Sequence, residues 1–174
     1  INNELKELEM KNARFMASVI EDEEFSMNGK SHTEFMIATN LGEEAKKLDK
    51  IASGGEMSRI MLAIKTVLSD IDEVPVLIFD EIDTGVSGKV ADAIGLKMHS
   101  ISLNNQVLCI THLPQVAIHA DHHYAIKKSS HDEETYSTLA VLNEDERIEE
   151  IAKMLSGDVI TPEAIDNAKR LLQG

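Results

Sequence analysis

Residues 76–81 read Val-Leu-Ile-Phe-Asp-Glu, a short apolar run that ends in two carboxylates. The run is too short for a helix and has no polar face, which is typical of a strand buried on both sides of a sheet. A helix is expected over residues 87–101 and a second apolar strand over residues 106–111. A strand, a helix and a strand in this order predict two parallel strands joined by a right-handed crossover.

The rest of the chain supplies helices and strands around this unit. The longest helical pattern begins near Ser53 and carries one apolar stripe. The stripe contains Met57, Ile60, Met61, Ile64, Leu68 and Ile71, while Arg59, Lys65 and Asp70 lie off it. Strands are also expected at 14–20, 33–39, 123–128 and 135–142, followed by two terminal helices, the last with Thr161 as its N-cap. The sequence therefore predicts an α/β fold in which helices flank a mostly parallel sheet, with a carboxy-terminal strand pair.

Length and composition limit the class of protein. A chain of 174 residues with 43% apolar and 28% charged residues is ordinary for one globular domain. It has no apolar run of about 18 residues, so no membrane is expected among its partners. Cys109 is the only cysteine and has no disulfide partner, which favours a reducing cytoplasm. The sequence starts at Ile1 without a methionine, and we expect it to be part of a longer chain.

The acidic charge of the chain makes it a poor candidate for a module that binds nucleic acid by itself. Seventeen basic and thirty-one acidic residues give a formal net charge of −14, which repels a phosphate backbone. The chain has no tryptophan, two tyrosines and four phenylalanines, so a platform for base stacking is not expected. Any strong DNA binding would have to come from other parts of a longer protein.

The first candidate motif is Ser53-Gly54-Gly55-Glu56, at the start of the long helix. A serine followed by a glutamate at the third position is a capping box, which satisfies backbone amides at a helix start. Two glycines weaken a helix by as much as about 1 kcal/mol each, but they are favoured where a ligand approaches the backbone. A helix N-terminus with a serine hydroxyl is also a phosphate site, and one serine can serve both purposes.

The second candidate motif is the acid pair Asp80 and Glu81, where open α/β sheets place their ligands. Asp80 would hold Mg²⁺, usually through water, and Glu81 would orient and polarise an attacking water. Alternatively, the two acids merely cap the next turn. Asp83 follows in a glycine-rich turn over residues 83–88, which needs no functional explanation as a turn.

The last candidate residue is His112, which follows the second apolar strand. If the two strands are neighbours, His112 and Glu81 project from the same edge of the sheet. An imidazole at that edge can form a hydrogen bond with a γ-phosphate or with the attacking water. A lone histidine at a strand end is more often a helix cap or an ordinary polar group.

These motifs occur in an order that resembles the signature motif, Walker B motif, D-loop and switch histidine of ABC ATPases. The stretches 51–63, 77–88 and 109–117 are similar to the RecN family, the bacterial SMC-like DNA-repair ATPases. The resemblance covers residues 48–128 well and the flanks more weakly. It implies that residues 14–174 are the carboxy-terminal lobe of an ABC/SMC-type P-loop NTPase head. Residues 1–13, with Leu5 and Leu8 on one helical face, would be the end of a coiled coil.

The resemblance also implies a role for each motif residue. In such heads the signature motif touches the γ-phosphate of ATP bound to the opposite head, which here would engage Ser53, Gly54, Gly55 and Glu56. Asp80 would serve Mg²⁺, Glu81 would be the catalytic base and His112 the γ-phosphate sensor. Asp83 would help to couple the two ATP sites of a dimer.

The implied activity is ATP hydrolysis at a dimer interface, in DNA double-strand-break repair and recombination. The implied partners are an amino-terminal head lobe with a Walker A motif, a second head, and DNA in the full-length protein. The implied location is the bacterial cytoplasm, in association with the nucleoid.

The sequence lacks the G-x-x-x-x-G-K-[ST] phosphate loop that cradles ATP in this class. The nearest candidate is Ser87-Gly88-Lys89-Val90, with Asp83 in place of the first glycine and Val90 in place of the hydroxyl residue. We expect the phosphate loop in the amino-terminal lobe. These 174 residues would then hold the catalytic carboxylates without the cradle and would be inactive alone.

Two other functions fit parts of the pattern. Asp80, Glu81 and Asp83 could form the acidic metal cluster of a toprim-like enzyme that uses Mg²⁺ on nucleic acid, which leaves the Ser53 motif and His112 unexplained. The chain could also be an interaction module that dimerises without nucleotide. Metal-dependent DNA cleavage would support the first function, and nucleotide-independent self-association would support the second.

The missing phosphate loop makes the first testable prediction. The 174-residue chain should neither hydrolyse ATP at a useful rate nor bind it tightly, because loop amides and a lysine normally hold the β- and γ-phosphates. Calorimetric titration with Mg-ATP measures this, and micromolar binding by the chain alone would contradict the assignment.

Overall fold

The structure is a computed structural model that describes residues 1–51, 53–69, 71, 74–86, 88–131, 134–157 and 159–174. These residues form two compact units, Ile1–Ile110 and Thr111–Gly174. No change in composition near residue 110 marks this division in the sequence. No helix in the described part of the chain has the length and apolar character needed to cross a membrane.

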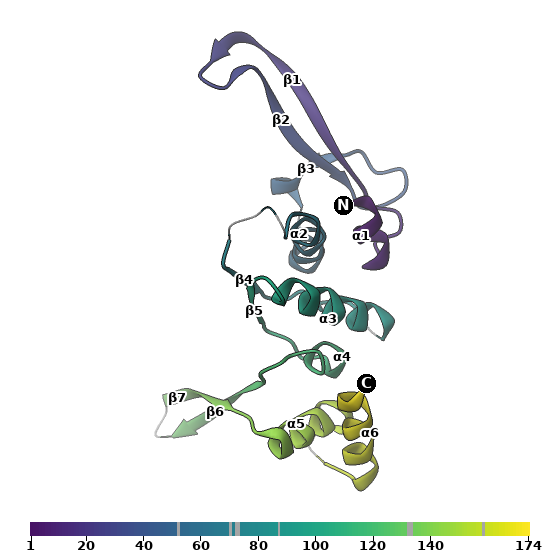
Figure 1. Cartoon of the computed structure of the whole chain (residues 1–174), viewed down its shortest axis with the longest axis vertical. Helices are drawn as coiled ribbons and strands as arrows, with labels where there is room; N and C mark the ends of the chain where they lie inside the picture. The colour runs from purple at the N-terminus through teal and green to yellow at the C-terminus, as the bar shows by residue number, and fades with distance from the viewer. Residues whose placement is uncertain (52, 70, 72–73, 87, 132–133, 158) are drawn as a thin grey trace. The chain divides into compact units, whose positions relative to one another are not determined.

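The first unit begins with helix α1 (Asn2–Glu7) and a long antiparallel hairpin of β1 (Arg14–Ser26) and β2 (Gly29–Ala38) (Figure 1). A two-residue strand, β3 (Lys46–Lys47), pairs with β2, and a 3-10 turn (Leu48–Lys50) follows. Helix α1 is shorter than the sequence suggested, and both hairpin strands are longer. Most hairpin residues are exposed, and backbone pairing there does not depend on an apolar pattern that sequence reasoning can detect.

Helix α2 (Gly54–Leu68) packs between α1 and α3 (Lys89–Ser102). Its fully buried side chains include Ile60, Leu62 and Ala63, whereas Ile71 beyond its end is 77% exposed. The predicted stripe was therefore only partly right. Because α2 contacts α1 on one side and α3 on the other, its buried face is broader than one stripe and includes Leu62 and Ala63.

Strands β4 (Val76–Phe79) and β5 (Gln106–Cys109) form a parallel pair joined by α3, as the sequence predicted. Their register matches Phe79 with Cys109, so both strands end at the same edge. The expectation of burial on both faces does not hold within the described residues. Ile78 is 68% exposed and Leu108 is 44% exposed, while Phe79 is buried.

The prediction of a mostly parallel sheet was wrong. The described strands form an antiparallel sheet of order β1-β2-β3, the parallel pair β4-β5, and an antiparallel pair of β6 (Tyr124–His131) and β7 (Glu134–Val141). The physical reason lies in the connections. Strands joined by a short turn pair antiparallel, and a parallel pair needs a crossover such as the one that α3 supplies.

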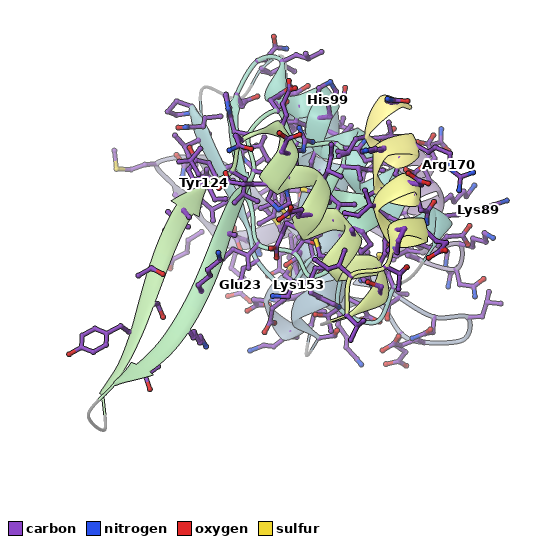
Figure 2. All side chains as sticks on the ribbon, turned by 90° about the horizontal axis from the view of Figure 1, so that it is seen from below. Glu23, Lys89, His99, Tyr124, Lys153 and Arg170 are labelled. Atoms are coloured by element: carbon purple, nitrogen blue, oxygen red, sulfur yellow. The ribbon has the colours of Figure 1, made fainter. Side chains whose placement is uncertain are left out.

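The second unit contains α4 (Pro114–Ala117), the hairpin of β6 (Tyr124–His131) and β7 (Glu134–Val141), and helices α5 (Glu144–Ser156) and α6 (Pro162–Gln173). Its core lies between α4, α5 and α6 and contains Ala117, Ile151, Ala152, Ala164 and Ala168. The hairpin extends away from α5 and α6 (Figure 2), and its side chains Ile126, Leu139 and Val141 are exposed.

Both terminal helices have side-chain caps. The Thr161 hydroxyl accepts a hydrogen bond from the Ala164 amide at 3.2 Å, as the sequence predicted for α6. Helix α5 has a complete capping box, in which the Asn143 side chain accepts the Glu146 amide at 3.0 Å. The Glu146 carboxylate in turn accepts the Asn143 amide at 2.8 Å.

The α5 cap gives a prediction about stability. Asn143→Ala should lower the free energy of unfolding by about 1 kcal/mol, because it leaves the Glu146 amide without its acceptor. Asn143→Asp keeps an acceptor at the same place and should stay close to the unchanged chain. Urea denaturation of the three proteins measures the difference, and equal losses in both variants would show that the cap does not stabilise α5.

Candidate functional site

Ser53 caps the start of α2, as the sequence predicted. Its hydroxyl accepts the Glu56 amide at 3.4 Å, and its backbone is extended, with φ −95° and ψ 120°. Ser53 is exposed, so its hydroxyl lies at the surface next to the first amides of the helix. Capping explains the serine in this structure, and contact with a phosphate stays a prediction.

The two glycines let a second segment of the chain lie against the start of α2. A Cβ atom added to Gly54 would lie 2.8 Å from Oε2 of Glu81. A Cβ atom added to Gly55 would lie 3.1 Å from the backbone oxygen of Thr84 and 3.3 Å from that of Glu81. Close approach therefore explains the glycines, and the approaching group in this structure is the turn that carries the acid pair.

Asp80 and Glu81 are both exposed at the end of β4, where the sequence placed them. Oδ1 of Asp80 accepts the Glu81 amide at 2.9 Å. Glu81 has a left-handed backbone with φ 56°, a conformation that costs a non-glycine residue about 1–2 kcal/mol. The chain thus turns sharply at Glu81, and its carboxylate comes to lie beside Gly54.

Asp83 is placed differently from the sequence expectation. The sequence predicted an exposed turn, but Asp83 is only 2% exposed and the preceding Ile82 is fully buried. The turn is closed by the Thr84 amide, which donates to the Glu81 carbonyl at 3.1 Å. Burial of a carboxyl group is unfavourable unless polar contacts compensate for the lost water. Its burial therefore distinguishes Asp83 from an ordinary, exposed turn residue.

Cys109, at the end of β5, is close enough to Asp80 and Asp83 for their charges to affect its thiol. Burial raises the pKa of the Cys109 thiol to about 12, and the negative charges of Asp83 and Asp80 act in the same direction. The thiol is therefore protonated at neutral pH and is a poor nucleophile.

Sequence reasoning missed two residues, Ser58 and Arg59, in the second turn of α2. The Ser58 hydroxyl donates to the Asp80 carbonyl at 3.0 Å, and Nη1 of Arg59 donates to the Thr84 carbonyl at 3.2 Å. Burial lowers the pKa of the Arg59 guanidinium, although the charge of Glu56 opposes this. Arg59 was expected off the packed stripe. The sequence signal that could have identified them is that two polar residues, Ser58 and Arg59, follow shortly after the glycine-rich start of the helix.

His112 lies in the second unit, after the end of β5 at Cys109 and before α4. Its side chain is exposed. The pairing of β4 with β5 confirms only that these two strands are neighbours, as the sequence predicted. Its role as a γ-phosphate sensor stays a prediction.

Within the described residues, no group of three or more His, Cys, Asp or Glu side chains is arranged to hold a metal ion. Asp83 is buried, whereas the carboxylates of Asp80 and Glu81 are exposed. Asp80 still offers Mg²⁺ a suitable hard oxygen ligand at a strand end. In nucleotide sites Mg²⁺ needs few protein carboxylates, because waters and phosphate oxygens complete its shell.

Comparison with curated proteins shows extensive similarity along the chain. DNA repair protein RecN of Haemophilus influenzae is 42% identical over 173 residues, which is 99% of this chain and 31% of that protein. This chain is a RecN homologue. RecN of Halalkalibacterium halodurans is 46% identical over 176 aligned residues, and RecN of Bacillus subtilis is 50% identical over 139. The chain spans 31% of the first of these two proteins and 24% of the second. No protein-family model matches the chain.

Solved structures of SMC heads resemble this chain in fold. The Smc head domain with a coiled coil and joint from Pyrococcus yayanosii has a TM-score of 0.61 and 18% identity, over 89% of this chain and 28% of that chain. The Smc head domain of Pyrococcus furiosus, bound to the carboxy-terminal domain of ScpA, has a TM-score of 0.54 and 19% identity, over 88% and 35%. The chain therefore has an α/β fold of the SMC head type.

The two glycines give a matched pair of variants. Gly55→Ala should lower the free energy of unfolding by about 1–3 kcal/mol, because its new Cβ atom meets a backbone oxygen that moves only with the turn. Gly54→Ala meets the end of the flexible Glu81 side chain, which can swing aside, so its effect should be smaller. Chemical denaturation of both variants measures this, and a larger loss for Gly54→Ala would contradict the observed packing.

Proposed function

We propose that this chain is the carboxy-terminal half of an SMC-like ATPase head that hydrolyses ATP between two heads of a DNA repair protein. One observation carries the proposal: the Glu81 carboxylate, exposed at the end of a parallel strand, lies against the glycine-rich start of α2. An exposed acid pair beside the N-terminus of a helix suits the chemistry of phosphoryl transfer to water.

The acid pair divides the work of hydrolysis. Asp80 would hold Mg²⁺ through water, and the bound ion would offset negative charge on the phosphates. Glu81 orients the attacking water and accepts its proton. The exposure of both side chains and the sharp turn at Glu81 support this division, because both carboxylates are accessible to a nucleotide.

The start of α2 acts on the nucleotide of the opposite head. Ser53, Gly54, Gly55 and Glu56 present a hydroxyl and helix amides, which suit a γ-phosphate. The chain's own nucleotide is held by an amino-terminal lobe with the Walker A motif, since these 174 residues contain no phosphate loop. His112 senses the γ-phosphate, and Asp83 helps to couple the two sites.

The remaining parts of the proposal concern the longer protein. Residues 1–13, of which Asn2–Glu7 are helical, lead into the head from the end of a coiled coil. The full-length protein acts in double-strand-break repair and recombination in the bacterial cytoplasm, associated with the nucleoid. Its contact with DNA is made mainly outside this chain, whose net charge of −14 opposes binding to a phosphate backbone.

Substitution of the catalytic base tests the proposal. In the full-length protein, Glu81→Gln should slow ATP hydrolysis by about 10²-fold or more, as expected when a positioned general base is removed. ATP binding should be retained and the ATP-bound dimer should accumulate, because the side chains are nearly isosteric and Asp80 is unchanged. Steady-state hydrolysis, nucleotide binding and gel filtration measure the three outcomes. Hydrolysis at the unchanged rate would refute the assignment of Glu81.

A mixing experiment separates the roles within one head from those across the interface. Ser53→Arg places a bulky cation at the start of α2, so dimerisation and hydrolysis should fail while each head still binds ATP. A heterodimer with Glu81→Gln contains one site with both intact residues, and mixing should therefore restore part of the activity. If subunits exchange and mixing restores nothing, the shared site is wrong and a nucleotide-independent dimer becomes the better account.

A further inference from the structure

Two side chains of α2 bind the backbone on both sides of Glu81. The Ser58 hydroxyl donates to the carbonyl of Asp80, and the Arg59 guanidinium donates to the carbonyl of Thr84, at 3.0 and 3.2 Å. These carbonyls belong to the first and last residues of the turn that carries the acid pair. The turn is thus attached to α2 at both of its ends.

The turn has a reason to need such attachment. Glu81 is held in a left-handed conformation, and strained backbone persists only where the surrounding structure enforces it. The bonds from the Glu81 amide to Asp80 and from the Thr84 amide to Glu81 lie within the turn itself. Local bonds shape the turn, whereas bonds from α2 also set its position relative to the rest of the unit.

Arg59 is partly buried, unlike an arginine on a fully solvated helix face. Its guanidinium is partly buried against the turn, and this burial lowers its pKa. Removing a cation from water is unfavourable unless its N–H groups are used, and the Thr84 carbonyl supplies one acceptor. We therefore infer that the partly buried Arg59 fixes the position of the turn through its bond to Thr84.

We propose that Ser58 and Arg59 are positioning residues for catalysis: they hold the turn 80–84 on α2 so that Glu81 keeps the conformation that presents its carboxylate. This rests on the proposed function of Glu81 as the general base. Neither residue touches the nucleotide in this proposal. Both act through the backbone of the turn.

The test uses the full-length protein and a matched pair of variants at Ser58. Ser58→Thr and Ser58→Val introduce the same β-branched shape, and they differ in that threonine keeps the hydroxyl donor. Ser58→Val should lower kcat roughly tenfold, with little change in KM for ATP, the effect of losing one hydrogen bond that matters in the transition state. Ser58→Thr should stay near the unchanged enzyme. Ser69→Ala is a control: the Ser69 hydroxyl donates to the Thr66 carbonyl at the C-terminal end of α2, and its loss should leave kcat unchanged.

A second comparison distinguishes positioning from general support of the fold. If Ser58 acts through Glu81, then Ser58→Val should slow hydrolysis no further in a protein that already carries Glu81→Gln. Losses that multiply would mean that Ser58 acts elsewhere and would overturn the proposal. Equal kcat for Ser58→Val and Ser58→Thr would overturn it as well.

Arg59→Lys keeps the inference testable if Ser58→Val does not fold. Lysine keeps the charge but lacks the planar fork that reaches the Thr84 carbonyl, so kcat should fall and the fall should vanish in the Glu81→Gln background. Unchanged kcat in Arg59→Lys would refute the role of Arg59. If Glu81→Gln alone leaves hydrolysis intact, the proposed function fails; if it slows hydrolysis while these variants do not, only the positioning role fails.

Discussion

The start of α2 can lie against the turn 80–84 because two glycines leave room for it. A Cβ atom on Gly55 would meet the backbone oxygen of Thr84 at 3.1 Å, and the Ser58 hydroxyl and Arg59 guanidinium bind the same turn from the next helical turn. One packing contact therefore positions the Ser53 motif, the acid pair and Asp83 together. A shift of α2 would displace all three, since the turn is attached to the helix at both ends.

Strain and electrostatics meet at Glu81. Its left-handed backbone is unfavourable for a residue with a side chain, yet it directs the carboxylate toward the first residues of α2. A helix N-terminus stabilises negative charge, so this placement offsets part of the backbone cost. The same amides are the groups that suit a phosphate, which links the resting position of Glu81 to the chemistry proposed for this surface.

The exposed apolar strands connect the fold with the proposed head. Ile78 and Leu108 lie on neighbouring strands and are 68% and 44% exposed, although the strand sequences are those of a sheet covered on both faces. Apolar strand surface of this kind is normally covered by other structure. The exposure agrees with the proposal that an amino-terminal lobe completes the head.

The sequence alone determined the local structure around the motifs. Apolar runs and caps predicted the β4-α3-β5 unit, the helix that begins after Ser53 and the N-cap at Thr161, because these features depend on nearby residues. It also placed Asp80 and Glu81 at a strand end, where the structure shows them. The carboxy-terminal strand pair was predicted as well. The pairing of β3 with β2, the burial of Asp83 and the bonds from Ser58 and Arg59 to the turn were decided only by tertiary structure. Each of these joins segments that are separated along the chain, and the local pattern of neither segment encodes which partner it meets.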